Sequence, residues 1–180
     1  MQQFQISYCL NRIILSETSG MQKILILFLS VTLFLSSCSK NGACSFQNDN
    51  VVAPVSEQQL VKAYLDSLGI TATLNPSGFY YQIVTPGNGS TPGVCSHIKV
   101  NYTGKLTNGN IFDQQSEILF TLGSLIDGWR KGIPLIKSGG EIKLYIPPTL
   151  GYGSSEVNTG TTVIPPNSIL LFDISLLNVQ

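Results

Sequence analysis

Apolar and polar residues alternate with a period of two through much of the chain after residue 78, and this pattern constrains the fold more than any other feature. Ile98, Val100 and Tyr102 stand between polar neighbours, and residues 141–146 repeat the pattern. Such alternation is typical of strands with one buried face. The segments with strand character are 79–84, 97–102, 118–122, 141–146 and 168–179. Because Asn108-Gly109 is a strong hairpin signal, we expect antiparallel pairing.

One short helix is predicted among these strands, over residues 127–133. Asp127 is suited to cap its start, and Pro134 disfavours its continuation. Seventeen glycines and nine prolines predict many turns, which favours short strands over long helices. The sequence therefore predicts an α+β fold in which an antiparallel sheet of five to six strands packs on one short helix.

A further helix is predicted N-terminal to the strands, over residues 56–69. Ser56 followed by Gln59 matches a capping box, and Gly69 is suited to end the helix. The apolar stripe consists of Leu60, Tyr64 and Leu68, with Val61 and Leu65 beside them. Because such a stripe needs a surface to cover, the helix is either an extension of the domain or a dimer contact. The sequence leaves the oligomeric state open.

The charge balance excludes one class of function. Lys and Arg together number 10, Asp and Glu together number 10, and only 11% of residues are charged. Nucleic-acid binders need a surplus of cations, so we expect no nucleic-acid partner.

The first part of the chain predicts export. Residues 24–35 are uncharged and apolar and follow Lys23, but they are too short to span a bilayer as a helix. The run ends in Leu35-Ser36-Ser37-Cys38, which resembles the lipobox of bacterial lipoproteins, in which the cysteine is lipidated. The alternative is a buried apolar helix with a chance cysteine. We interpret 1–20 as a start-site extension and 21–37 as a lipoprotein signal peptide, which implies attachment to the membrane by lipid at Cys38.

The polar segment 38–55 is predicted to be a flexible tether. Ser39 after the lipidated cysteine is compatible with sorting to the periplasmic face of the outer membrane. In an oxidising compartment Cys44 and Cys95 form a possible disulfide; two free thiols are the alternative. Residues 56–77 then comprise the N-terminal helix and a linker to the main domain.

The sequence lacks the common motifs for zinc binding, phosphate binding and nucleophilic catalysis. His97 is the only histidine, no Cys or His cluster has zinc spacing, and no phosphate-binding glycine loop is present. A Ser–His triad would depend on His97 alone. We therefore expect no metal and no cofactor.

Aromatic residues near turns form an ordered series of motifs. The series comprises Val100-Asn-Tyr-Thr-Gly, Asn108-Gly-Asn-Ile-Phe-Asp113, Phe120-Thr-Leu-Gly, Leu125-Ile-Asp-Gly-Trp129, Pro147-Pro-Thr-Leu-Gly-Tyr-Gly153, Ile164-Pro-Pro and Leu171-Phe-Asp173. It resembles the FKBP-type peptidyl-prolyl cis–trans isomerases over residues 78–180, and together with the lipobox-like segment it resembles a bacterial lipoprotein form of that family. The resemblance implies a curved sheet wrapped around the short helix.

The resemblance also implies a site for the prolyl ring of a substrate. Trp129 would form the floor of an apolar cup. The walls would be Tyr102, Phe112, Phe120, Leu125, Ile126, Ile164 and Phe172. The Ile126 backbone N–H and the Tyr152 hydroxyl would donate to substrate carbonyls, while Asp113 would orient Tyr102 or polarise the amide. The implied catalytic residues are Asp113, Tyr152 and Trp129.

The implied activity is isomerisation of proline bonds in exported polypeptides, which would be the partners of this chain. The alternative is a non-catalytic chaperone that binds proline-containing segments with the same cup. One departure from the family is Ile118, where family members commonly carry an aromatic residue. The stretch 151–164, which would overhang the cup, is also slightly longer than in a minimal family domain.

Overall fold

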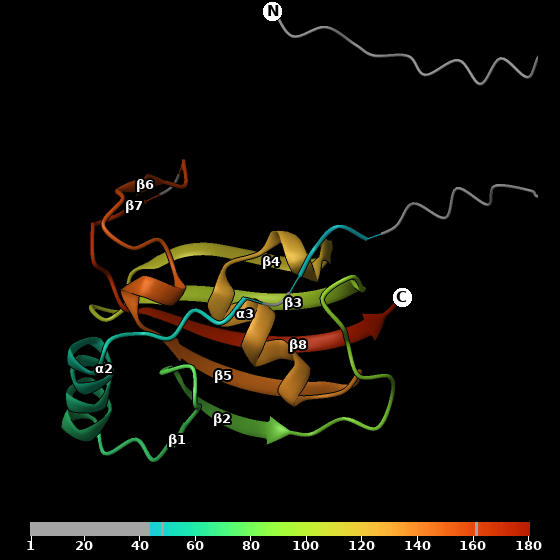
Figure 1. Cartoon of the computed structure of the whole chain (residues 1–180), viewed down its shortest axis with the longest axis horizontal. Helices are drawn as coiled ribbons and strands as arrows, with labels where there is room; N and C mark the ends of the chain where they lie inside the picture. Colours follow the sequence, from blue (N-terminus) through green and yellow to red (C-terminus); the bar gives the residue numbers. More distant parts are fainter. Residues whose placement is uncertain (1–43, 48, 161) are drawn as a thin grey trace, which may run out of the picture. The chain divides into compact units, whose positions relative to one another are not determined.

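The alternating segments form a six-stranded antiparallel sheet in a computed structural model, which describes residues 44–47, 49–160 and 162–180 (Figure 1). The strand order is β1-β2-β5-β8-β3-β4. The strands are β1 (Thr73–Leu74), β2 (Tyr80–Thr85), β3 (His97–Leu106), β4 (Ile111–Thr121), β5 (Gly140–Ile146) and β8 (Leu170–Val179). The extension 1–20, the signal peptide 21–37 and Cys38 lie outside the described residues. The six-stranded sheet, together with the short helices described next, confirms the predicted α+β fold.

Short helices and one small hairpin complete the domain. The helical elements are α2 (Val55–Ser67), η2 (Leu122–Ser124), α3 (Asp127–Gly132), η3 (Ile133–Leu135) and η4 (Pro148–Leu150). Strands β6 (Val157–Asn158) and β7 (Val163–Ile164) pair as a separate hairpin within the stretch 151–164. Neither this hairpin nor β1 is predicted from the sequence, because strands of two residues are too short to show a period. No helix in the described part of the chain is long and apolar enough to span a membrane.

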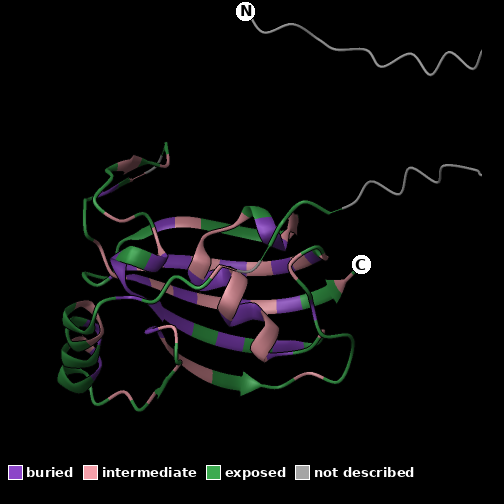
Figure 2. Cartoon of the chain, in the orientation of Figure 1, coloured by how far each residue is buried: buried purple, intermediate pink, exposed green. Residues whose placement is uncertain are grey.

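The apolar residues of the predicted alternation lie on the buried face of the sheet. Every second residue of β3 is buried, from Ile98 to Leu106, and β8 follows the same pattern from Leu170 to Leu176 (Figure 2). Helix α3 packs on this face by close approach to β5. A Cβ at Gly128 would lie 2.5 Å from Ile146, and one at Gly132 would lie 2.7 Å from Leu144, so larger residues would push the helix away.

The predicted helix boundaries need two corrections. Helix α2 begins at Val55 rather than after Ser56, because the Pro54 carbonyl already accepts the N–H groups of Glu57 and Gln58 at 3.0 and 3.1 Å. No side chain caps this end of the helix. In α3 the N-cap is Ile126, and Asp127 lies in the first helical turn.

The end of α2 agrees with the prediction, whereas its buried stripe does not. Gly69 has a φ of +66°, and Ile70 donates to the Leu65 carbonyl at 2.9 Å, as in a Schellman motif. The buried residues are Val61 and Leu65, whereas Leu60 is 59% exposed and Leu68 is 57% exposed. The helix turns Val61 and Leu65 towards Tyr145 of β5 and thus extends the domain.

The described part of the predicted tether lies against the domain. A disulfide joins Cys44 to Cys95, with their Cα atoms 5.8 Å apart. The Phe46 ring covers Gly123, where a Cβ would overlap it, and Ala53 is buried with its N–H donating to the Ser77 carbonyl at 3.0 Å. Because of these contacts, residues 44–180 form one compact unit.

Candidate proline-binding cavity

A cavity of about 190 Å³ opens between α3, the sheet and the segment that follows η4. Eight residues line it: Tyr102, Asp113, Phe120, Leu125, Ile126, Trp129, Tyr152 and Phe172. All eight were predicted as site residues, although they come from β3, β4, α3, β8 and the connecting loops. Larger hollows exist elsewhere on the domain, but polar side chains dominate the largest of them, on the outer face of the sheet.

Trp129 is the most enclosed aromatic residue of the cavity, at 4% exposed. Three rings meet it nearly edge-on, with centroid distances of 5.1 Å to Tyr102, 5.2 Å to Phe172 and 6.2 Å to Phe120. Edge-to-face packing of this kind holds aromatic rings in defined orientations. Its indole Nε1–H is buried and has no acceptor among the described residues. The arrangement is an aromatic surface in which four rings pack against one another.

Three polar groups stand around this aromatic surface. The Tyr102 hydroxyl donates to Oδ2 of Asp113 at 2.5 Å. Burial, together with this hydrogen bond, raises the pKa of Tyr102 above its ordinary range. Burial and the nearby charge of Asp113 also raise the pKa of Tyr152. Both phenols therefore remain protonated hydrogen-bond donors at neutral pH.

The backbone of Ile126 supplies one more donor. Ile126 is the residue before α3, so its N–H lies outside the helical hydrogen-bond ladder. No protein acceptor for this N–H exists within the described ranges. A ligand carbonyl in the cavity would satisfy it.

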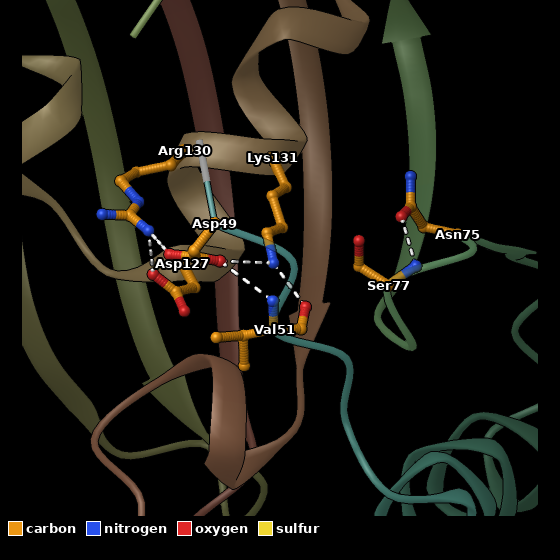
Figure 3. A network of polar contacts seen from close by, with 7 residues as sticks. All are labelled: Asp49, Val51, Asn75, Ser77, Asp127, Arg130 and Lys131. Atoms are coloured by element: carbon orange, nitrogen blue, oxygen red, sulfur yellow. Dashed lines mark hydrogen bonds and ion pairs between the residues drawn. The ribbon is translucent and has the colours of Figure 1, made fainter. Parts of the chain in front are cut away.

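Ion pairs hold α3 in place from the side opposite the sheet. Asp49 pairs with Arg130 and, at 2.9 Å, with Lys131, and Arg130 also pairs with Asp127 at 2.7 Å (Figure 3). Lys131 donates in addition to the Val51 carbonyl. These contacts are not predicted from the sequence, because nothing in the polar segment around Asp49 indicates a partner about 80 residues away. They brace the helix that carries Trp129.

Two predicted wall residues do not line the cavity. Phe112 and Ile164 are buried in the core instead, at 2% and 1% exposed. Phe112 meets Phe172 edge-on at 5.5 Å and so supports a wall from behind. Ile118, the departure from the family pattern, packs partly buried against the core and likewise does not reach the cavity.

The described residues include no group of three or more His, Cys, Asp or Glu side chains that could hold a metal ion.

The β6–β7 hairpin is attached next to the cavity, since the Thr159 hydroxyl donates to the Phe112 carbonyl at 2.8 Å. This contact lies at a turn of the stretch 151–164 and has no local sequence signal.

Comparisons with known proteins agree with this geometry. The family model for FKBP-type peptidyl-prolyl cis-trans isomerase matches residues 89–177. A probable FKBP-type peptidyl-prolyl cis-trans isomerase of Haemophilus influenzae is 45% identical over 108 residues, which cover 58% of this chain and 44% of that protein. The chain thus spans less than half the length of the curated relatives it matches.

Solved structures show the same fold. The crystal structure of FkpA from Escherichia coli superposes with a TM-score of 0.62 at 30% identity, covering 92% of this chain and 75% of that one. The crystal structure of AtFKBP13 superposes with a TM-score of 0.55 at 34% identity, covering 61% of this chain and 99% of that one. By fold, by ordered motifs and by these similarities, the chain belongs to the FKBP-type peptidyl-prolyl cis–trans isomerase family.

Proposed function

We propose that this chain catalyses cis–trans isomerisation of X–Pro bonds in exported polypeptides. The observation that carries the proposal is the apolar cavity centred on Trp129, with hydrogen-bond donors at its rim. Rotation about a proline amide needs neither a nucleophile nor a proton transfer. It needs only a site that favours the twisted amide over the planar one.

The barrier arises from amide resonance and is about 18–20 kcal/mol. A planar amide is strongly dipolar, and a twisted amide is less so. A dry aromatic cavity therefore disfavours the planar ground state relative to the transition state. Each 1.4 kcal/mol of this difference corresponds to a rate increase of about tenfold.

The polar groups would orient the substrate around this apolar surface. In the proposal, the prolyl ring lies on Trp129, and the Ile126 N–H and the Tyr152 hydroxyl donate to substrate carbonyls. The carboxylate of Asp113 fixes the Tyr102 hydroxyl by their hydrogen bond and places a negative charge beside the amide. Asp113, Tyr152 and Trp129 would thus be the catalytic residues. Tyr102, Phe120, Leu125, Ile126 and Phe172 would contact the substrate, with Phe112 and Ile164 behind them.

The location of the protein is also part of the proposal. The apolar segment 24–35 and the lipobox-like sequence ending at Cys38 support export and a lipid anchor, on the periplasmic face of the outer membrane. Proline isomerisation takes about 10–100 s without catalysis, which is slow enough to delay folding of exported proteins. The clients would be such proteins with proline-containing segments.

A protease-free isomerisation assay on the full chain tests the activity. The substrates are tetrapeptides that differ in the residue before proline. We expect acceleration with a preference for apolar residues at that position. No acceleration by a chain that is folded by circular dichroism would overturn the proposal in favour of a non-catalytic module that binds proline-containing segments.

A further inference from the structure

The side chain of Glu57, in the first turn of α2, reaches the turn that leads to Tyr152. Its Oε2 accepts the backbone N–H of Thr149 at 2.9 Å, and its Oε1 accepts the Thr149 hydroxyl at 2.7 Å. Thr149 lies in η4, 92 residues further along the chain. One carboxylate therefore links the N-terminal helix to the segment beside the cavity.

This contact satisfies the N-terminal end of η4. Pro148 has no N–H, and the Leu150 N–H donates to the Pro147 carbonyl at 3.1 Å. The Thr149 N–H would otherwise lack a protein acceptor, as is usual at the start of a helix. The Glu57 carboxylate accepts this N–H, and a hydrogen bond to a charged acceptor is stronger than one to a neutral acceptor.

The capped turn determines where the Tyr152 backbone lies. The N–H groups of Gly151 and Gly153 both donate to the Pro148 carbonyl at 2.9 Å, one on each side of Tyr152. Leu150 is fully buried and anchors the turn in the core. The Tyr152 side chain itself is 38% exposed, so packing alone does not hold its ring. Its hydroxyl position depends on the turn.

We propose that Glu57 is a positioning residue for the hydroxyl of Tyr152, so that helix α2 forms part of the cavity's supporting structure. The inference rests on the proposed isomerase function, in which this hydroxyl donates to a substrate carbonyl. It assigns a role to α2, which extends the domain at its N-terminal end. Glu57 lies between Ser56 and Gln59, the two residues of the predicted capping box, and nothing in the sequence indicates its contact with Thr149.

Hydrogen exchange on the unliganded full chain tests the positioning without any substrate. In Glu57→Ala we expect the amide protons of Thr149, Gly151 and Gly153 to exchange roughly tenfold faster than in the wild type. The matched control is Asp66→Ala, which removes an exposed ion pair with Lys62 on the same helix. Unchanged exchange at these three amides in Glu57→Ala would overturn the proposal.

A double-mutant cycle tests whether Glu57 acts through Tyr152. We expect Glu57→Ala to lower kcat/KM for a proline tetrapeptide roughly three- to tenfold. The same change in a Tyr152→Phe background should have no further effect. Glu57→Gln should retain most of the activity, because its amide oxygen can still accept the Thr149 N–H. An equal loss in both backgrounds would show a merely structural role and would overturn the inference.

The two measurements separate this inference from the proposed function. A wild-type chain that accelerates no proline peptide contradicts the isomerase function. The exchange rates then still decide whether Glu57 holds the turn, because they require no turnover.

Discussion

The hydroxyl of Tyr102 donates a 2.5 Å hydrogen bond to Oδ2 of Asp113, and this contact joins the buried face of β3 to the rim of the cavity. Tyr102 also meets Trp129 edge-on at 5.1 Å. One tyrosine therefore connects the carboxylate to the enclosed aromatic surface. A change at either end of this contact should alter both the chemistry and the stability of the site.

Replacement of Asp113 by Asn is expected to lower kcat/KM about tenfold, because a neutral amide is a weaker acceptor and removes the negative charge beside the substrate. The protease-free tetrapeptide assay measures this loss. Asp173→Asn is the matched control, since Asp173 pairs with Lys105 and Lys143 at 3.1 Å outside the cavity. Equal turnover by Asp113→Asn and the wild type would contradict a catalytic role for Asp113.

Tyr102 is expected to make stability depend on pH in the alkaline range. Burial and the hydrogen bond to Asp113 raise its folded pKa above the unfolded value of about 10. Below about pH 10 both states hold the proton, and the contribution of Tyr102 to stability is fully present. Above about pH 10 the unfolded chain loses the proton first, so the free energy of unfolding falls until the folded pKa is passed.

Urea denaturation at pH values below and above this point checks the effect. Tyr102→Phe has no phenol to ionise in either state. Its free energy of unfolding should therefore fall less steeply above about pH 10 than that of the wild type. Parallel curves for the two proteins would show that Tyr102 ionises equally easily in both states.

The Cys44–Cys95 disulfide is expected to stabilise the domain. It closes a loop with a sequence separation of 51 residues. Constraint of the unfolded chain by such a loop corresponds to about 2–4 kcal/mol. The double variant Cys44→Ser, Cys95→Ser should therefore unfold at lower urea concentration. Reductant should shift the wild type towards the variant and leave the variant unchanged; a wild type that is insensitive to reductant would argue against the bond.

Membrane attachment is expected to depend on Cys38. Without a lipid acceptor, Cys38→Ser should shift the protein from the membrane fraction to the soluble fraction after cell breakage. Labelling with a radioactive fatty acid should give signal for the wild type and none for the variant. Cys44→Ser, six residues further along, is the control and should stay in the membrane. Retention of Cys38→Ser in the membrane would contradict the lipid anchor.

Much of the sheet follows from local patterns in the sequence, and the site residues follow from the resemblance of the ordered motifs to the family. The alternation in 97–102 and 141–146 identifies strands because successive side chains point to opposite faces. The ordered motifs from Val100 to Asp173 resemble those of the family, and this resemblance names the eight residues, five of them aromatic, that meet in one cavity. Each of these signals occupies only a few consecutive residues, so it is visible without a structure.

Contacts between distant segments were decided only by the tertiary structure. Tyr145 lies on the predicted polar face of its strand, yet it is buried because Val61 and Leu65 of α2 cover it. The carboxylate of Glu57 caps η4 rather than its own helix, and Asp49 pairs with the helix that carries Trp129. Each partner is about 80 or more residues away, and such pairs leave no period or spacing in the sequence. The chain alone determined which segments become strands and which aromatics form the site, whereas long-range packing decided what holds them in place.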